Sequence, residues 1–225
     1  MTTTNLRGPP TLRVRRKRAT REALAAEAMA LFVAHGFDAV SVDEIAIAAG
    51  VSRRTFFRYF PTKESVFFAA QEARLAAFQA ALAAPAATGD AGTLIRNAAL
   101  LLADRYEGNR AAILSENDVL SASTVLHAYD AQLDANWERA LQSALERSYA
   151  TTDDAAAQTP DALREDAIVV AGAVLGVMRA VLRAWLESRG AFDLRVRGVH
   201  ALARLAPLLA IFSAPATADP TQEGT

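Results

Sequence analysis

The sequence contains no cysteine and only three histidines among its 225 residues. The absence of cysteine excludes a disulfide scaffold, a thiol nucleophile and a zinc site with thiolate ligands. The histidines, His35, His127 and His200, do not have the spacing of metal ligands. We therefore expect no metal ion and no cofactor.

Glycine and proline are also scarce, at 11 and 8 residues, and aromatic residues make up only 7% of the chain. Alanine, by contrast, supplies 52 residues. Alanine has the highest helix propensity, whereas β-rich folds depend on β-branched and aromatic residues. The composition therefore predicts an all-α fold, and the length suits one large domain or two small ones.

A long apolar segment is missing as well. The longest apolar run without a charge, residues 167–178, has 12 residues, whereas a helix needs about 20 to cross a bilayer. The first residues do not contain the apolar core of a signal peptide. These two observations predict a cytoplasmic protein with no membrane partner.

The net charge of −1 conceals a strong asymmetry along the chain. Residues 1–65 carry 11 basic and 6 acidic side chains, whereas residues 66–225 carry 13 basic and 19 acidic ones. Residues 1–21 alone hold seven basic groups and no acid. A basic end on an acidic body suggests that the N-terminal part faces a nucleic acid.

Apolar periodicity, helix caps and breakers predict about nine helices. Thr20 is the expected cap of the first helix, and Thr62 that of the fourth. The pattern divides the chain into a flexible arm over 1–19, a head over 20–65, a helical body over 66–212 and a disordered tail over 213–225. The expected helices span 20–35, 42–49, 53–60, 63–84, 92–106, 110–121, 125–149, 162–188 and 194–212.

Residues 41–60 have the pattern of a helix-turn-helix. Ser41 and Glu44 form a capping box that opens a short helix, Gly50 ends it, and Ser52 caps the next helix. The apolar residues expected to anchor the two helices are Ile45, Ala46, Ala49, Val51, Phe56 and Phe60. The positions left to point outward are Arg53, Arg54, Phe57 and Arg58. Arginine binds guanine or phosphate through paired hydrogen bonds, although exposed arginines are also common on helices that bind nothing.

The stretch from Arg16 to Ala70 resembles the DNA-binding head of TetR-family transcriptional regulators. The matching motifs are Phe32 with Gly36-Phe37, the segment Ser41–Ala46, the turn Ala49–Ser52 and the run Thr55–Glu64. The match covers about a quarter of the chain, and its many ordered positions make it specific. The resemblance implies a homeodomain-like three-helix head, a helical ligand-binding and dimerisation body, and double-stranded DNA as a partner.

The resemblance also implies which residues of the head contact DNA. The expected phosphate contacts are Ser41, Ser52, Tyr59 and Lys63. The base-reading start of the recognition helix comprises Arg53, Arg54 and Thr55, and Val42 and Arg58 complete the set. Phe57 stands where the family often has tyrosine, so a phosphate hydrogen bond is lost there and contact with a thymine methyl group becomes the expected role.

The basic arm offers two interpretations. Arg16 and Arg18 could lie in an adjacent minor groove, as the arms of other helix-turn-helix proteins do. The arm could equally be a solubilising tail, and the sequence leaves both interpretations open.

TetR-like regulators dimerise through their last two long helices, which places an interface at 162–188 and 194–212. Gly172 and Gly176, four residues apart, would let two helices approach closely, although small residues also suit an ordinary alanine-rich core. We expect these glycines, with Leu202 and Leu205, at a homodimer interface. Two-fold symmetry then predicts a pseudo-palindromic operator.

The family's ligand pocket lies among the middle helices of the body. Polar residues inside apolar stretches are the candidates for it: Asn97, His127, Arg179 and Arg183. Arg179 and Arg183 lie one turn apart and could bind a carboxylate or phosphate, or could pair with acids such as Glu187. The run 53–64 resembles a branch of the family with an acyl-CoA-like ligand-binding body, which suggests a fatty acyl-CoA or similar amphipathic effector.

The leading hypothesis is a repressor that binds its operator as a dimer and is released by a small hydrophobic or amphipathic ligand. An architectural DNA-binding protein without an effector is the alternative, and the sequence does not decide between repression and activation. An enzyme is not expected, because the chain contains no P-loop, no G-x-S-x-G motif and no metal cluster.

Overall fold

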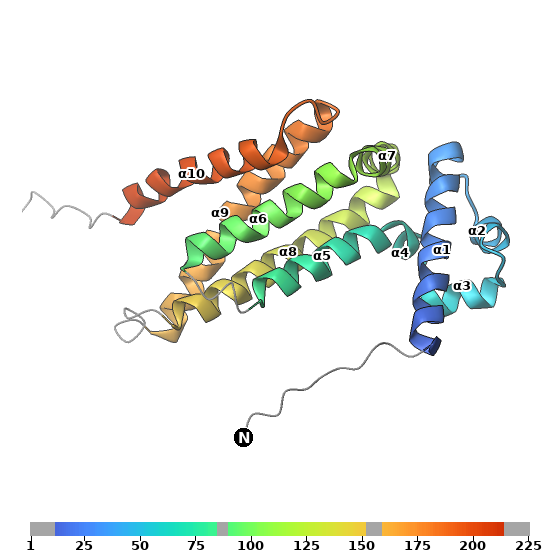
Figure 1. The fold of residues 1–225 in the computed structure, drawn as a ribbon, viewed down its shortest axis with the longest axis horizontal. Coiled ribbons are helices and arrows are strands. Elements are labelled where there is room, and N and C mark those ends of the chain that lie inside the picture. Colours follow the sequence, from blue (N-terminus) through green and yellow to red (C-terminus); the bar gives the residue numbers. More distant parts are fainter. Residues whose placement is uncertain (1–11, 85–89, 152–158, 214–225) are drawn as a thin grey trace, which may run out of the picture. The chain divides into compact units, whose positions relative to one another are not determined.

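The computed structural model describes residues 12–84, 90–151 and 159–213, and the regular structure in these ranges is entirely α-helical. This confirms the predicted all-α fold (Figure 1). The described helices are α1 (Leu12–His35), α2 (Val42–Ala48), α3 (Arg53–Tyr59), α4 (Lys63–Phe67), α5 (Ala69–Leu82), α6 (Ala91–Gly108), α7 (Arg110–Ser121), α8 (Thr124–Tyr149), α9 (Pro160–Glu187) and α10 (Leu194–Ser213).

Contacts divide the chain into two compact units. The first unit contains the chain up to Leu75 together with Ala111–Leu133, and the second contains Ala76–Arg110 together with the chain from Asp134 onward. The first unit therefore includes most of α7 and the start of α8, which the sequence pattern groups with the body. The assignment of residues 111–133 to the first unit depends on contacts between distant parts of the chain, so local periodicity in the sequence does not predict it.

Helix α1 begins earlier than predicted. It starts at Leu12, so residues 12–19 of the predicted flexible arm are helical, and residues 1–11 lie outside the described part. Thr20 does not cap the helix, because its hydroxyl donates to the Arg16 carbonyl 3.0 Å away, one turn back. The density of basic residues predicted a flexible arm. However, arginine and lysine are also good helix formers, and residues 12–19 contain no glycine or proline.

The caps of the helix-turn-helix agree with the prediction. The Ser41 hydroxyl accepts from the Glu44 N–H at 3.2 Å, and the Glu44 carboxylate accepts from the Ser41 N–H at 2.7 Å. Hydrogen bonds from the Ser41 side chain and then from its backbone lower the pKa of Glu44. The Ser52 hydroxyl accepts from the Thr55 N–H at 3.1 Å, and Gly50 takes a φ of +65° in the turn between the helices. A φ in this region favours glycine, which explains why the turn falls at this residue.

The predicted helix over 63–84 is two helices in the structure, α4 and α5, separated at Phe68. Five consecutive residues around this point, Ser65–Ala69, are buried. A regular α-helix turns about 100° per residue and cannot direct five successive side chains into one core. The helix is thus interrupted where the chain is surrounded by the core, and sequence periodicity does not reveal this interruption.

The core of the first unit is built from aromatic rings. Phe32, Phe37 and Phe67 lie with ring centroids 5.0–6.2 Å apart, and Phe68 stacks on Tyr129 of α8 at 4.9 Å. The predicted anchors of the two short helices are also buried: Ile45, Ala46, Phe56 and Phe60. This core fixes α2 and α3 on α1 and leaves the opposite faces of both short helices exposed.

In the second unit, α10 packs against α9 and α6. The N–H of Leu194 donates to the Glu107 carboxylate of α6 at 2.5 Å, and Arg195 forms an ion pair with Asp104. The turn before α10 contains Gly190 at a φ of +73°, where an added Cβ would overlap the Arg110 side chain. The positive φ is what favours glycine here, since the guanidinium of Arg110 is the end of a flexible side chain that can move aside.

Candidate nucleic-acid interface

Helix α3 presents three arginines to solvent because its other face is fixed in the core. Phe56 and Phe60, four residues apart, are buried, and their rings lie 5.9 Å apart. The side chains of Arg53, Arg54 and Arg58 are exposed on the remaining surface. Three cations on one short helix form a surface suited to phosphates and to the acceptor atoms of guanine.

Arg53 is held by two neighbours. Its Nη1 atom lies 2.6 Å from Oδ2 of Asp43 in the first turn of α2, and its guanidinium carbon lies 5.5 Å from the centre of the Phe57 ring. Arg58 lies over the ring of Tyr59 at 5.3 Å. Arg54 is exposed, and the structure shows no ion pair for it among the described residues. The three arginines of α3 thus differ in how firmly they are positioned.

The uncharged residues that were predicted to contact DNA differ in how exposed they are. Thr55 is half-buried, with its hydroxyl 3.0 Å from that of Ser52. Phe57 is 43% exposed, so part of its side chain is available to a base. Val42 packs against the core, and the Ser41 hydroxyl also donates to the Glu44 carboxylate at 2.7 Å.

Lys63 has a structural role that the sequence did not reveal. Its ammonium donates to the carbonyls of Phe37 and Val40, each at 2.9 Å, and lies 4.2 Å from the centre of the Phe37 ring. These bonds fix the loop that leads into α2. An ammonium has three N–H donors, so one remains for a phosphate after these two bonds.

The basic start of α1 forms a helical surface rather than an extended arm. Arg16 and Arg18 are exposed, and Arg18 donates to Glu22 at 2.6 Å. Exposed pairs of this kind contribute little to stability. Whether this surface contacts DNA stays a prediction.

Two residues of α2 were missed at the sequence level. Asp43 binds Arg53 directly, and Ile47 is 78% exposed although it is a large apolar residue. They lie four residues apart and therefore on one face of α2. The capping pattern indicated only Ser41 and Glu44. The four-residue spacing of Asp43 and Ile47 was the sequence signal that could have identified these two residues.

The structure does not bring the candidate ligand residues together. Asn97, His127 and Arg183 are exposed, and His127 belongs to the first unit whereas the others belong to the second. Arg179 forms an ion pair with Asp134, with 3.3 Å between Nε and Oδ2. Of the two roles considered for Arg179, pairing with an acid therefore fits the structure better than ligand binding. Its partner is Asp134 and not Glu187.

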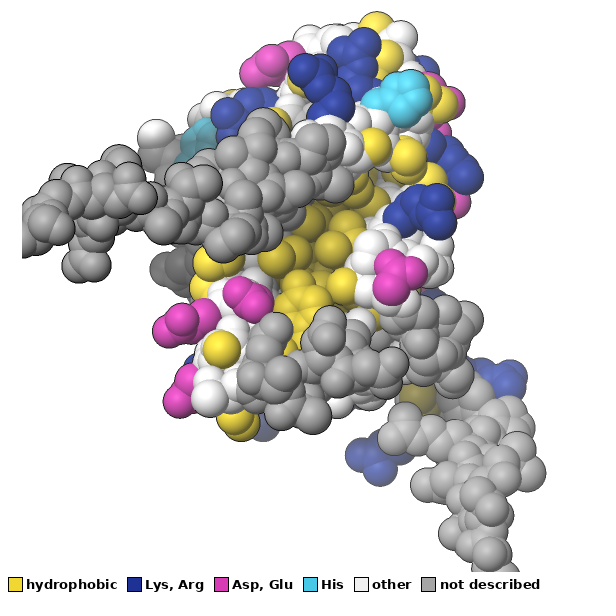
Figure 2. Space-filling model, turned by 90° about the vertical axis from the view of Figure 1, so that its left-hand side faces the viewer, with side chains coloured by type: hydrophobic (Ala, Val, Ile, Leu, Met, Phe, Trp, Pro, Cys, Tyr) yellow, Lys and Arg dark blue, Asp and Glu magenta, His cyan; other side chains and the backbone are white. Residues whose placement is uncertain are grey.

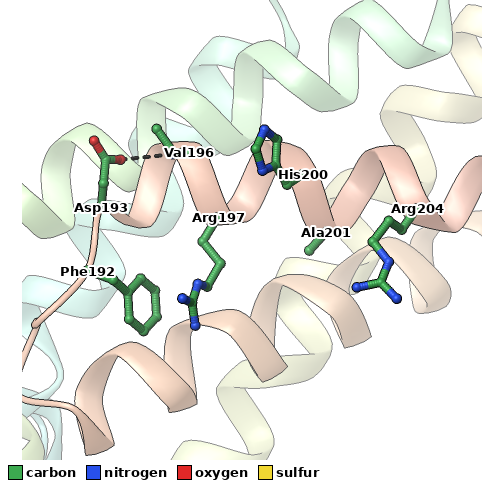
Figure 3. Close-up of a pocket in the computed structure, with 7 residues that line it drawn as sticks. All are labelled: Phe192, Asp193, Val196, Arg197, His200, Ala201 and Arg204. Carbon is green, nitrogen blue, oxygen red and sulfur yellow. Dashed lines mark hydrogen bonds between the residues drawn. The ribbon is translucent and has the colours of Figure 1, made fainter.

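A groove of about 530 Å³ follows one face of α10 (Figure 3). It is lined by Phe192, Asp193, Val196, Arg197, His200, Ala201 and Arg204, none of which was a candidate at the sequence level. The guanidinium of Arg197 lies over the Phe192 ring at 4.0 Å, and Asp193 accepts from the Val196 N–H at 2.8 Å. The groove contains both cationic and apolar side chains.

Helix α9 leaves much of its apolar surface uncovered. An 18-residue window within it is apolar enough to cross a membrane by composition, yet only 22% of that window is buried. Ile168 and Val169 of α9 are exposed. Figure 2 views the molecule from one side, and hydrophobic side chains gather in the middle of that view.

The predicted interface residues differ in their surroundings. A Cβ on Gly172 would lie 3.6 Å from the Glu138 side chain of the same chain, whereas one on Gly176 would meet nothing within 4 Å. Leu202 and Leu205 are half-buried. Gly176 is therefore open to a partner helix, whereas Gly172 faces α8.

Comparison with known proteins identifies a family and two curated relatives of this chain. The family model of bacterial regulatory proteins, tetR family, matches residues 24–70. MftR of Mycobacterium tuberculosis, a proposed mycofactocin biosynthesis transcriptional regulator, is 31% identical over 174 residues, which cover 77% of this chain and 83% of that protein. The HTH-type transcriptional regulator TcmR of Streptomyces glaucescens is 47% identical over 73 residues, or 32% of each chain.

Solved structures share the fold at lower identity. NalD of Pseudomonas aeruginosa, a repressor of the MexAB-OprM multidrug efflux pump, has a TM-score of 0.57 at 17% identity, covering 86% of this chain and 96% of its own. FadR of Thermus thermophilus, solved with lauroyl-CoA, has a TM-score of 0.55 at 22% identity, covering 91% and 100%. At these identities the similarity shows a shared fold.

Proposed function

Because the chain belongs to the TetR family of bacterial transcriptional regulators, we propose that it is a repressor that binds a pseudo-palindromic operator as a homodimer and is released by a small ligand. The observation that carries the proposal is the recognition helix α3, which is anchored by Phe56 and Phe60 and exposes three arginines. The protein acts in the bacterial cytoplasm and has no enzymatic activity in this proposal.

At the operator, α3 enters the major groove and its first turn reads bases. Arg53, Arg54 and Thr55 provide the base contacts, and Phe57 contacts a thymine methyl group. Ser41, Ser52, Tyr59 and Lys63 bind phosphates and set the register of the head on the duplex. The other predicted DNA contacts are Val42 and Arg58, with Arg16 and Arg18 of α1.

The dimer forms through α9 and α10. The uncovered apolar surface of α9 supports this assignment, because a soluble chain with an apolar surface of this extent gains free energy by burying it against a partner. Gly176, Leu202 and Leu205 lie in this interface. An isologous dimer places two recognition helices about one helical turn of DNA apart, which requires a pseudo-palindromic operator.

The effector is a small hydrophobic or amphipathic molecule. This class is supported by solved relatives of the fold, since FadR of Thermus thermophilus was solved with lauroyl-CoA and FadR of Bacillus subtilis with stearoyl-CoA. A ligand that binds one conformation of the dimer better than the other shifts the population away from the DNA-binding state. A coupling of about 1–3 kcal/mol is sufficient for regulation.

Selection from a random duplex library by the purified protein, at fixed and stated salt, tests the proposal. Enrichment of a pseudo-palindrome would support a dimeric, sequence-specific regulator. Binding without a motif that disappears on addition of salt would contradict it, and would favour an architectural DNA-binding protein. Titration of the selected complex with lauroyl-CoA then tests the effector class, with lauroyl-CoA-dependent release as the expected result and unchanged binding as the contrary one.

A further inference from the structure

Arg53 and Asp43 join the first turns of the two short helices in the head. The ion pair of 2.6 Å crosses from α2 to α3, and the two side chains remain 60% and 54% exposed. An exposed pair of this kind adds little to the stability of a fold. Its position at the start of the recognition helix therefore calls for an explanation other than stability.

The aromatic neighbour of Arg53 is itself fixed. The Phe57 ring meets the Phe56 ring edge-on, with centroids 5.4 Å apart and planes at 86°. Since Phe56 is completely buried, the Phe57 ring is supported from below by the core. Arg53 thus lies beside a supported aromatic surface while Asp43 holds one end of its guanidinium.

We propose that Asp43 is a specificity-determining residue that positions Arg53 to read a guanine. The inference rests on the proposed function, because it assigns a role within DNA recognition by α3. A guanidinium has five N–H donors in a rigid plane. With Nη1 held by Asp43, the edge formed by Nη2 and Nε stays available for the two acceptors that guanine presents in the major groove, O6 and N7.

The carboxylate of Asp43 also opposes unselective binding. Near the DNA surface it repels phosphates, and this repulsion is the same for every sequence. Only where Arg53 meets a guanine do two hydrogen bonds compensate for it. An attractive contact for the correct base combined with a repulsive group for every other site is a general route to specificity.

The test measures the affinity of the full-length protein for its selected operator and for a random duplex at the same salt. Asp43→Ala should lower the ratio of the two affinities by about tenfold, the discrimination expected of one bidentate arginine–guanine contact. In library selection the same variant should lose its preference for guanine at one position in each half-site. Affinity for the random duplex should stay unchanged or rise.

A conservative variant separates positioning from charge. Asp43→Asn removes the charge but keeps an oxygen that accepts from Arg53, so it should restore part of the guanine preference. Glu27→Ala removes another exposed carboxylate of the head, on α1, and should leave the ratio unchanged. In an Arg53→Ala background, Asp43→Ala should cause no further loss of specificity, because the two residues act as a unit.

Three results would overturn the inference. The first is an Asp43→Ala variant that keeps the guanine preference, and the second is an Asp43→Asn variant that equals Asp43→Ala. The third is a gain in affinity of the same size for operator and random DNA, which charge alone explains. A wild-type protein that selects no motif would refute the proposed function together with this inference, whereas a retained motif in Asp43→Ala refutes the inference alone.

Discussion

The two compact units differ in how completely a single chain buries their apolar residues. In the first unit, Phe32 of α1, Phe56 of α3 and Phe67 of α4 are almost fully buried, and each lies close to another aromatic ring. In the second unit, only 22% of the most apolar window of α9 is buried, and Ile168 and Val169 are exposed. The first unit therefore completes its core by itself, whereas the second keeps exposed apolar residues on α9 that the proposed dimer would bury.

The difference matches the chemistry that each unit presents. A reading head needs side chains held in fixed geometry, which the aromatic core and the caps at Ser41 and Ser52 provide. The surface of α9 is rich in alanine and valine. Such a surface suits close packing against another helix, but it offers few polar groups for recognition of a specific partner. Four experiments, three of them with a comparison variant, test this contrast in order from the largest expected effect to the smallest.

Removal of a central ring of the head should have the largest effect. Phe56→Ala leaves a cavity in a fully buried position and should lower the free energy of unfolding by about 3–5 kcal/mol. Urea unfolding monitored by circular dichroism measures the loss. Phe57→Ala, one residue away but largely exposed, is the matched control and should cost far less; equal losses would show that the head lacks the rigid core described above.

A charge on the uncovered face of α9 should separate the protomers. Val169→Glu places a carboxylate on this apolar surface and should weaken the dimer by at least about 2 kcal/mol, roughly thirtyfold in Kd. Sedimentation equilibrium measures the dissociation. Val33→Glu, on an exposed position of α1, should leave the oligomeric state unchanged. A Val169→Glu protein that dimerises normally would exclude this face as the interface.

The arginine without a fixed partner should act on specificity alone. Arg54→Ala should cost about 1–3 kcal/mol at the operator and relax one base position. Lys63→Ala should weaken all sequences alike and also lower the melting temperature, because its bonds to the Phe37 and Val40 carbonyls are lost. Binding to operator and random duplexes distinguishes the two. Equal losses on both duplexes for Arg54→Ala would remove it from base reading.

The capping box should have the smallest effect. Ser41→Ala removes the acceptor for the Glu44 N–H and should cost about 1 kcal/mol of stability. The pKa of Glu44 is lowered in the folded state by the Ser41 hydrogen bonds, so its contribution is present above the ordinary carboxyl pKa and is lost as the pH falls through the lowered value. Thermal melts of both proteins between neutral and acid pH should therefore converge; a constant difference would contradict the role of Glu44.

The amino-acid sequence by itself determined the features that depend on neighbouring residues. The capping box of Ser41 and Glu44, the cap at Ser52 and the turn at Gly50 follow from local hydrogen bonding and backbone sterics. The buried faces of the short helices follow from apolar spacing, and the family follows from the ordered motif. These interactions are complete within a few residues, so the sequence contains all the information for them.

Tertiary structure decided what depends on distant segments meeting. The pairing of Asp43 with Arg53, the bonds of Lys63 to two loop carbonyls and the return of α7 and α8 into the first unit join residues from different elements. The interruption at Phe68 lies within five consecutive buried residues, Ser65–Ala69. Such contacts are selected by the packing of the whole unit, and no local pattern of spacing or propensity encodes them.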